Sequence, residues 1–160
     1  MDRRIISICR GDSYYKTKVI LDNGEIITLD DNIEKVVDEY LRCYGTSLSI
    51  SKMICNEIFN FKRILPIIVS TMHDMYLCVN MKLSDESIVL FDLDKVIDYS
   101  YDGEFINLFF RNFSLKILCS KSTFELQCKR IEEMRKYYDK GNKFTTEFIK
   151  DLKEGNNYYE

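Results

Sequence analysis

The sequence predicts an α+β domain: an antiparallel, strand-rich meander of about seven strands, barrel- or sandwich-like, with an early helix and a packed C-terminal helix. Two observations support this class. Between residues 50 and 119, apolar and polar residues alternate with a period of two, and turn residues recur about every ten positions. On either side, over residues 31–44 and from residue 122 onward, apolar residues recur at intervals of three and four.

Length and composition favour a single domain over residues 1–160, with residues 142–160 as a short C-terminal appendage. The apolar fraction of 46% is enough for a hydrophobic core. No segment reaches the roughly 18 apolar residues of a membrane span, and no adequate apolar segment follows Arg3 and Arg4 to make a signal peptide. We therefore expect a cytoplasmic protein that does not bind a membrane.

The cysteine pattern argues against a metal or a cofactor. The chain has six cysteines, none of them in a CxxC pair, and one histidine, so a zinc site would need scattered ligands. Asp92, Asp94, Asp98 and Asp102 lack the spacing of an EF-hand loop, and polar positions on a half-exposed strand and a turn account for them. We expect no cofactor, and free, mostly buried thiols in a reducing compartment.

The N-terminal part predicts a strand over residues 3–9 and a hairpin with arms at 17–22 and 25–29. The arms bracket Asn23-Gly24, a dipeptide typical of a type I′ turn, in which both central residues have a positive φ.

A helix is predicted from Asp31 to Tyr44. Asp31 and Glu34 have the spacing of a capping box, and an apolar stripe follows at helical intervals. Gly45 suits the left-handed turn that ends a helix. The face opposite the stripe is acidic.

The period-two segment divides into candidate strands separated by turns. Asp102-Gly103 is a hairpin turn signal and Asn112 is a weaker one. Pro66 lacks a backbone donor, so it begins an edge strand or marks a bend. The candidate strands are 50–59, 65–70, 75–81, 87–92, 94–101, 104–110 and 113–119. A strand-rich barrel closed by a late helix resembles pleckstrin-homology architecture.

The late helix is predicted to begin at Ser122, which forms a capping box with Glu125, and to end at Gly141. Residues 145–153 are expected to form one more short helix. The last six residues are expected to fray.

The net charge of −3 does not indicate nucleic-acid binding, but the charge is unevenly distributed. Residues 22–39 and 74–104 each carry a net charge of −6, whereas residues 1–18 carry +3 and residues 111–150 carry +5. Phosphate contacts need cations on a rigid scaffold, and minor-groove reading favours cations that reach out of loops. Taken singly, each cation is more simply explained as a solvated surface charge. The candidate DNA-binding residues are Arg42, Lys52, Lys62, Arg63, Arg111, Lys116 and Lys121.

His73 is the only histidine and lies beside Asp74, between two predicted strands. A loop histidine next to an aspartate can act as a general base. A solvated loop residue is the simpler interpretation, because the sequence contains no nucleophile elbow and no glycine-rich phosphate loop. We predict that the chain is not an enzyme.

Two segments carry a family resemblance. Residues 43–49 read C-Y-G-T-S-L-S, followed by a lysine, a strand, the run P-I-I-V at 66–69 and an apolar strand. Residues 120–127 read S-K-S-T-F-E-L-Q. In order and spacing, over about residues 40–135, they resemble the ComK family, the competence transcription factors of Firmicutes, with its aromatic-Gly-Ser/Thr run and its S-x-x-S/T-F-E-x-Q segment.

The resemblance implies a cytoplasmic transcriptional activator. Such a protein binds A/T-rich double-stranded DNA, largely from the minor groove, as a homo-oligomer that bends the DNA. The implied protein partners are RNA polymerase and a Clp protease adaptor. The adaptor-recognition segment, F-M-L-Y-P in the best-known members, reads F-I-K-D-L at residues 148–152.

An alternative function remains open: a regulatory protein-interaction module on the same fold that has lost DNA binding. Family members often carry Gly-Arg-Lys after the Ser run, whereas this chain has Ile50-Ser51-Lys52, without the arginine. Minor-groove insertion depends on such a side chain. The acidic helix 31–44 would suit a protein partner.

Overall fold

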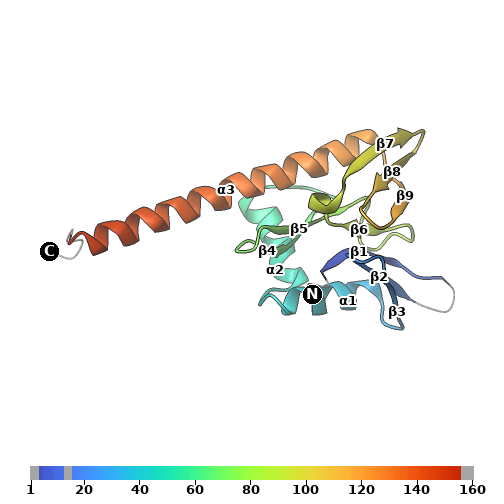
Figure 1. The fold of residues 1–160 in the computed structure, drawn as a ribbon, viewed down its shortest axis with the longest axis horizontal. Helices are drawn as coiled ribbons and strands as arrows, with labels where there is room; N and C mark the ends of the chain where they lie inside the picture. The colour runs from blue at the N-terminus through green and yellow to red at the C-terminus, as the bar shows by residue number, and fades with distance from the viewer. Residues whose placement is uncertain (1–3, 13–15, 156–160) are drawn as a thin grey trace.

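The computed structural model describes residues 4–12 and 16–155 and has an α+β fold (Figure 1). In these ranges the strands form one antiparallel sheet of six strands and one of three, neither closed into a barrel. The strands are β1 (Ile5–Arg10), β2 (Thr17–Leu21), β3 (Ile26–Leu29), β4 (Ile67–Ser70), β5 (Met75–Val79), β6 (Val89–Phe91), β7 (Asp98–Asp102), β8 (Phe105–Phe109) and β9 (Ser114–Leu118). The helices are α1 (Ile33–Arg42), α2 (Leu48–Met53), the π-helix η1 (Ile54–Ile58), the 3₁₀-helix η2 (Leu93–Lys95) and α3 (Lys121–Lys153).

The α+β class is confirmed, whereas the barrel-like alternative does not hold because both sheets are open. The pleckstrin-homology likeness depended on a closed barrel, so it does not hold either. Two sheets that share one core correspond to the sandwich-like alternative.

The larger sheet has the strand order β3-β2-β1-β6-β5-β4. Its centre joins the N-terminal hairpin to a strand about eighty residues away, with Ile8 opposite Leu90. The buried hydroxyl of Ser7 donates to the Leu90 carbonyl at 2.8 Å and strengthens this junction. The sheet is therefore not the simple meander of sequential neighbours that the sequence predicts.

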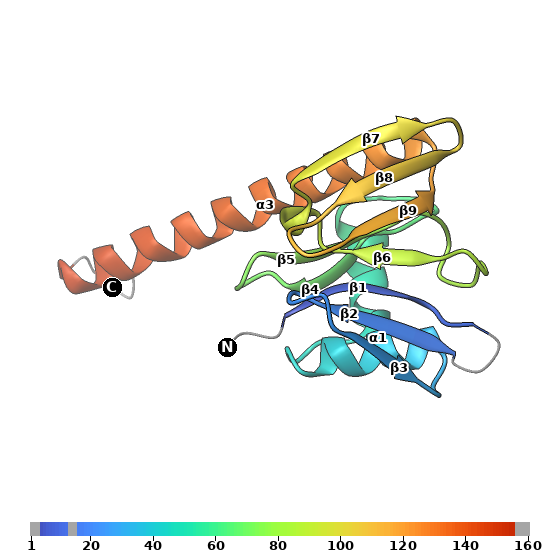
Figure 2. The same ribbon diagram turned by 45° about the vertical axis from the view of Figure 1, so that its right-hand side comes forward.

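Other elements cover both faces of the larger sheet (Figure 2), whereas its edge strand β3 is largely exposed. Helix α1 packs Ile33, Val37 and Leu41 against one face. The smaller sheet, η1 and α3 cover the other face. β5 is buried along its whole length, with successive residues in alternate cores, which explains its continuous apolar run M-Y-L-C-V.

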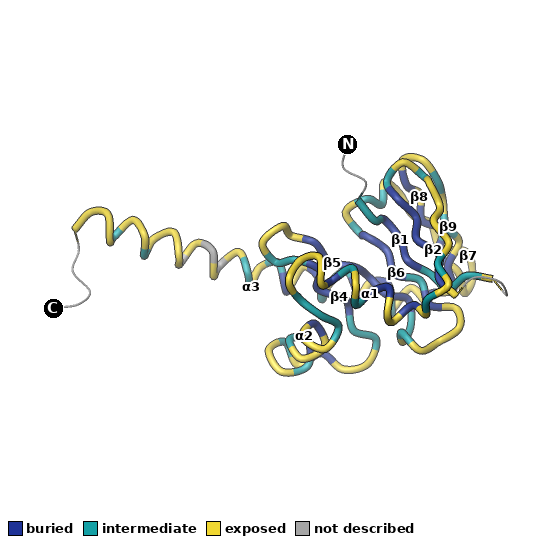
Figure 3. The backbone as a smooth tube through the Cα atoms, turned by 90° about the horizontal axis from the view of Figure 1, so that it is seen from below, coloured by how far each residue is buried: buried dark blue, intermediate teal, exposed yellow. Residues whose placement is uncertain are grey.

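Helix α3 packs Phe124, Ile131 and Met134 into the core and then extends beyond the body, where its residues are mostly exposed (Figure 3). The prediction that Gly141 ends this helix is wrong, because α3 continues to Lys153 and includes the predicted helix 145–153. A glycine within a helix costs only about 1 kcal/mol relative to alanine, so it need not end one.

The predicted strand 50–59 is also wrong, because α2 and the π-helix η1 occupy this segment. Ser47 caps α2 by accepting from the Ile50 amide at 3.2 Å. The residues Ile50, Ile54 and Ile58 recur every four positions, a spacing that fits a helix as well as a strand. Cys55 is fully buried, and its thiol donates to the Pro66 carbonyl.

Caps and turns differ in detail from the predictions. Asn32, not Asp31, caps α1 by accepting from the Lys35 amide, and Ser120, not Ser122, caps α3. At Asn23-Gly24 only the glycine has a positive φ, of 85°, and its amide donates to the Leu21 carbonyl. The turn is therefore not type I′ but a type I turn followed by a left-handed glycine.

The other predicted strands occur in shortened or slightly shifted form. In the predicted strand 94–101, η2 takes the first part and only the later part pairs, as β7. Gly45 and Gly103 have φ of 77° and 62°, as a helix end and a hairpin turn require. Residue 3 of the first predicted strand, and residues 156–160 of the predicted frayed end, lie outside the described residues. Among the described helices, none is long and apolar enough to cross a membrane.

Candidate nucleic-acid interface

Helix α2 and the loop 59–66 carry three of the predicted contacts: Lys52, Lys62 and Arg63. Lys52 lies on the exposed side of α2. On the other side, the buried Ser51 hydroxyl accepts from the Ile68 amide at 2.9 Å. This bond fixes α2 to β4 and therefore fixes the backbone that carries Lys52.

The loop 59–66 is held in place by α3. Arg130 donates from Nη1 to the Ile64 carbonyl and from Nη2 to the Lys62 carbonyl, both at 2.9 Å. Gln127 donates from Nε2 to the same Ile64 carbonyl at 2.6 Å. Between these anchors, Arg63 has a φ of 60°, a left-handed conformation that costs a non-glycine residue about 1–2 kcal/mol. The α3 side chains thus hold the strained backbone of Arg63.

Lys52 and Arg63 line one groove together with Lys82. The groove has a volume of about 530 Å³ and lies between α2, the start of β4 and the loop after β5. No described residue forms an ion pair with any of these three cations. Glu34 of α1 is the acidic residue in the lining.

Lys82 was missed by the sequence analysis, because it lies in a segment of net charge −6. The sequence signal that could have identified Lys82 is its place in a turn directly after an apolar strand. Lys62 is exposed in the same loop as Arg63 but does not line the groove.

The predicted contacts Arg111, Lys116 and Lys121 lie elsewhere, on the smaller sheet and the start of α3. Lys116 pairs with Asp102 at 3.1 Å and lies over the Phe105 ring. Lys121 lies 4.0 Å from Glu125. Arg111 is exposed in the loop between β8 and β9. These residues do not line the groove of Lys52 and Arg63.

Arg42 is engaged within α1. Its Nε donates to Asp38 at 2.8 Å. The Leu48 amide, followed by Arg42 itself, lowers the pKa of Asp38. The Asp38 carboxylate in turn raises the pKa of Arg42. Asp38 therefore joins the end of α1 to the start of α2, and Arg42 already has an ion-pair partner in its own helix.

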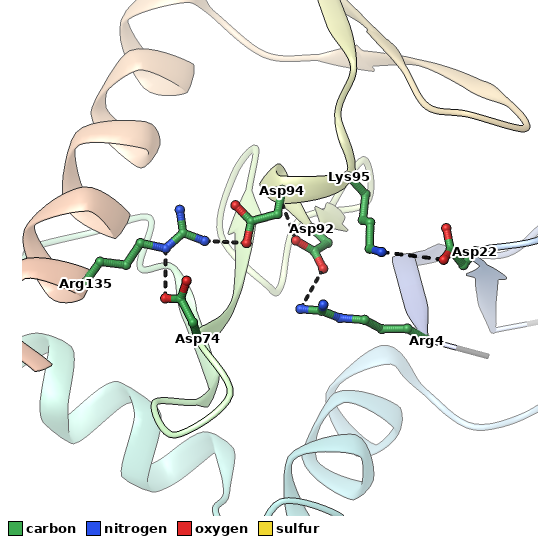
Figure 4. A network of polar contacts seen from close by, with 7 residues as sticks. All are labelled: Arg4, Asp22, Asp74, Asp92, Asp94, Lys95 and Arg135. Carbon is green, nitrogen blue, oxygen red and sulfur yellow. Dashed lines mark hydrogen bonds and ion pairs between the residues drawn. The ribbon is translucent and has the colours of Figure 1, made fainter. Parts of the chain in front are cut away.

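Two of the four aspartates considered for a metal site, Asp92 and Asp94, instead belong to a polar network (Figure 4). Arg135 of α3 bridges Asp74 and Asp94. Arg4 pairs with Asp92 at 3.1 Å, and burial raises the pKa of this carboxyl. No group of three or more His, Cys, Asp or Glu side chains suited to a metal occurs in the part of the chain that the structure describes.

His73 lies in the turn between β4 and β5 and is exposed. Its Nδ1 lies 2.9 Å from the Ser70 hydroxyl, which also accepts from the His73 amide at 3.2 Å. The neighbouring Asp74 is engaged by Arg135. The two hydrogen bonds close the turn, so His73 has the contacts of an exposed loop residue.

The cysteines match their prediction in part. All six are free thiols, but only three of them are buried, while Cys9 and Cys128 are half-buried and Cys43 is exposed.

The relationship of this chain to known proteins follows from a match to one family model. A family model described as ComK protein matches residues 4–143. The chain belongs to the ComK family. The ComK match extends well beyond the segments that carried the resemblance and includes β1, the groove and the core-packing part of α3. ComK proteins are competence-type transcription factors, a family that is not enzymatic.

No curated protein and no solved structure matches the chain. The segment expected to resemble the adaptor-recognition site, residues 148–152, lies beyond the ComK match, on the exposed end of α3. There Ile149 and Leu152 are exposed.

Proposed function

We propose that this ComK-family chain is a DNA-binding transcriptional activator that recognises A/T-rich DNA through the groove of Lys52, Arg63 and Lys82. The observation that carries the proposal is the convergence of these three cations, none with an ion-pair partner among the described residues, on one groove. Cations on a rigid scaffold supply the phosphate contacts from which DNA affinity arises.

Arg63 takes the place of the arginine that is absent from Ile50-Ser51-Lys52. It comes from the loop 59–66 rather than from α2, yet it lines the same groove as Lys52. Arginine is the side chain preferred in the narrow, electronegative minor groove of A-tracts. On the exposed side of α2, Ile50 and Met53 are 43% and 48% exposed, and apolar side chains beside such cations can wedge between base steps.

The test is binding of a fluorescent A/T-rich duplex and a G/C-rich duplex of equal length, measured by anisotropy over a range of salt concentrations. We expect tighter binding to the A/T-rich duplex. Lys52→Ala and Arg63→Ala should each weaken binding and flatten the salt dependence by about one unit of slope. Lys129→Ala, which removes an exposed lysine of α3 outside the groove, is the matched control. Equal affinity for the two duplexes at low salt would sink the proposal.

We extend the proposal to the partners that the family implies: RNA polymerase, a second copy of the chain, and a Clp adaptor at the exposed end of α3. These are separate from the DNA test. Co-purification with RNA polymerase and the mass of the DNA complex would check the first two, and adaptor binding by a chain with Ile149→Asp would check the third.

A second candidate function is a regulatory protein-interaction module without DNA binding. Glu34 faces the groove, and Arg42, Lys116 and Lys121 lie beside acidic residues of the same chain. A chain that binds RNA polymerase but neither duplex would favour this candidate.

A further inference from the structure

The groove of Lys52, Arg63 and Lys82 has a floor that DNA binding does not need. This floor consists of buried lining residues, Pro66 with Ile67 and Val79, which are 7% and 3% exposed, whereas the three cations are exposed side chains. Duplex DNA presents phosphates, sugars and base edges, and its phosphates need only the cations at the rim. The apolar floor is therefore unexplained by the proposed function.

The size and lining of this groove match a site for one small molecule. Its volume of about 530 Å³ lies within the range of about 300–1,000 Å³ that is typical of ligand sites. A smaller depression of about 330 Å³ adjoins it and shares Arg63 and Lys82, so both cations lie where the two spaces meet.

The charges define the head group of the ligand. Three cations line the groove against one carboxylate, that of Glu34, which leaves a net charge of +2. Asp85 lines the adjoining depression, where its Oδ2 accepts from the Lys82 amide at 3.1 Å. A single anionic head group thus accepts hydrogen bonds from several donors at the rim of the groove, and an apolar body packs against its floor.

The walls of the groove are fixed, so the site exists before a ligand binds. Arg10 of β1 donates from Nε to the Asp85 carbonyl at 3.0 Å and holds the loop that carries Lys82. On the opposite side, Ser51 fixes α2 and Arg130 fixes the loop of Arg63. A preformed site spares the ligand the entropic cost of ordering these loops.

We propose that this groove binds a small amphiphilic anion, with an apolar body on the floor and a carboxylate, phosphate or sulfonate at Lys52, Arg63 and Lys82. Occupation neutralises the cations assigned to DNA phosphates, so the ligand and DNA compete. Only this competition rests on the proposed function; ligand binding itself does not.

The probe is 8-anilinonaphthalene-1-sulfonate, an apolar anion whose fluorescence reports binding to the full chain. We expect saturable binding at one site, and displacement by decanoate below its micelle concentration. Decyltrimethylammonium, which has the same tail and a cationic head, and acetate, which has the head without the tail, should not displace the probe. Displacement by decyltrimethylammonium as readily as by decanoate would overturn the proposal.

Charge-reversal variants locate the site. Lys82→Glu and Lys52→Glu change exposed side chains and should weaken probe binding by about tenfold or more, whereas Lys129→Glu should leave it unchanged. Thermal unfolding of each variant checks that it is folded. Unchanged probe affinity in both groove variants would place the probe elsewhere and overturn the assignment.

Two further measurements separate the outcomes. Sedimentation with phosphatidylglycerol vesicles tests a membrane as the source of the amphiphile, and vesicle binding without decanoate binding contradicts a small-molecule site. Decanoate should weaken binding to the A/T-rich duplex in proportion to its occupancy of the groove. Decanoate binding by a chain that binds no DNA would refute the proposed function alone, and DNA binding that decanoate never weakens would refute the competition.

Discussion

Arg130 of α3 donates to the main-chain carbonyl of Ile64 at 2.9 Å, across a separation of 66 residues. This bond ties the late helix to the loop that carries Lys62 and Arg63. The guanidinium also lies over the Phe61 ring, with its central carbon 4.9 Å from the ring centroid. The orientation of the candidate DNA-binding loop therefore depends on a helix that does not line the groove.

Arg130→Ala should loosen this loop and weaken DNA binding, although Arg130 does not line the groove itself. Loss of a charged donor to two carbonyls should lower the free energy of unfolding by about 1–3 kcal/mol. Amide hydrogen exchange over residues 60–66 should accelerate by more than exchange in β5. The matched control is Lys129→Ala, on the neighbouring exposed position of α3. Unchanged exchange in the loop would show that Arg130 does not hold it.

Two glycine substitutions should have opposite effects. Gly141 lies within α3, and an added Cβ would meet no atom within 4 Å. Gly141→Ala should stabilise the local helix by about 0.5–1 kcal/mol and slow hydrogen exchange over residues 143–153 about two- to fivefold.

Gly24→Ala is the contrasting variant. Gly24 has a φ of 85°, and its added Cβ would lie 3.4 Å from the Asn112 Cβ. The left-handed conformation should cost about 1–2 kcal/mol in global unfolding free energy, measured by urea denaturation. A stabilising effect of Gly24→Ala would contradict the turn geometry.

Asp92 should contribute to the pH dependence of stability with a definite sign. Burial raises its pKa above the ordinary 3.8, against the opposing attraction of Arg4. The protonated carboxyl is then favoured by folding, so this contribution is complete below pH 3.8 and is lost as the pH rises through the raised folded-state pKa.

The measurement is urea unfolding of the wild type and Asp92→Asn at pH values from about 3.5 to 6.5. The difference in unfolding free energy, wild type minus variant, should fall with rising pH. Subtraction removes the titration of the other carboxyls. A difference that rises with pH would mean that Arg4 outweighs burial and lowers the pKa of Asp92.

The thiols should differ sharply in reactivity. Burial raises the pKa of Cys55 and of Cys119 to about 11, and raises that of the fully buried Cys78 well above its ordinary value. Cys43 is exposed at the end of α1. Since the thiolate is the reactive species, Ellman's reagent at pH 8 should modify one thiol rapidly in the native chain.

Cys43→Ser should remove the rapid phase, and urea should make all remaining thiols reactive. Cys9 and Cys128, which are half-buried with raised pKa values, should react slowly. A rapid phase that survives in Cys43→Ser would contradict the exposures.

Local patterns predicted much of the secondary structure. Helix α1 and strands β8 and β9 lie within a few residues of their predicted positions because each follows one period over its whole length. Strand β5 does so because it is one continuous apolar run. The segment 50–59 was predicted wrongly, because its isoleucines suit both a helix and a strand period. Its helical form depends on hydrogen bonds of Ser51 to β4 and of Cys55 to Pro66. Such distant partners leave no local signal.

The sequence predicted only some of the cations that line the groove. Lys52 and Arg63 were named from sequence, but Lys82 was not, and Arg111, Lys116 and Lys121 lie outside the groove. Arg130, which holds the loop of Arg63, was not among the candidate residues. Each of these outcomes depends on which loops the fold brings together, and sequence spacing does not contain that information.

By itself, the sequence determined the α+β class, the two principal helices, the free thiols and the family, because these follow from local periodicity, composition and the order of short segments. Only the tertiary structure decided the β1–β6 pairing and the groove where Lys52, Arg63 and Lys82 meet. The reason is physical: a strand pair or a groove wall is made by residues tens of positions apart, and burial of a shared core selects their partners.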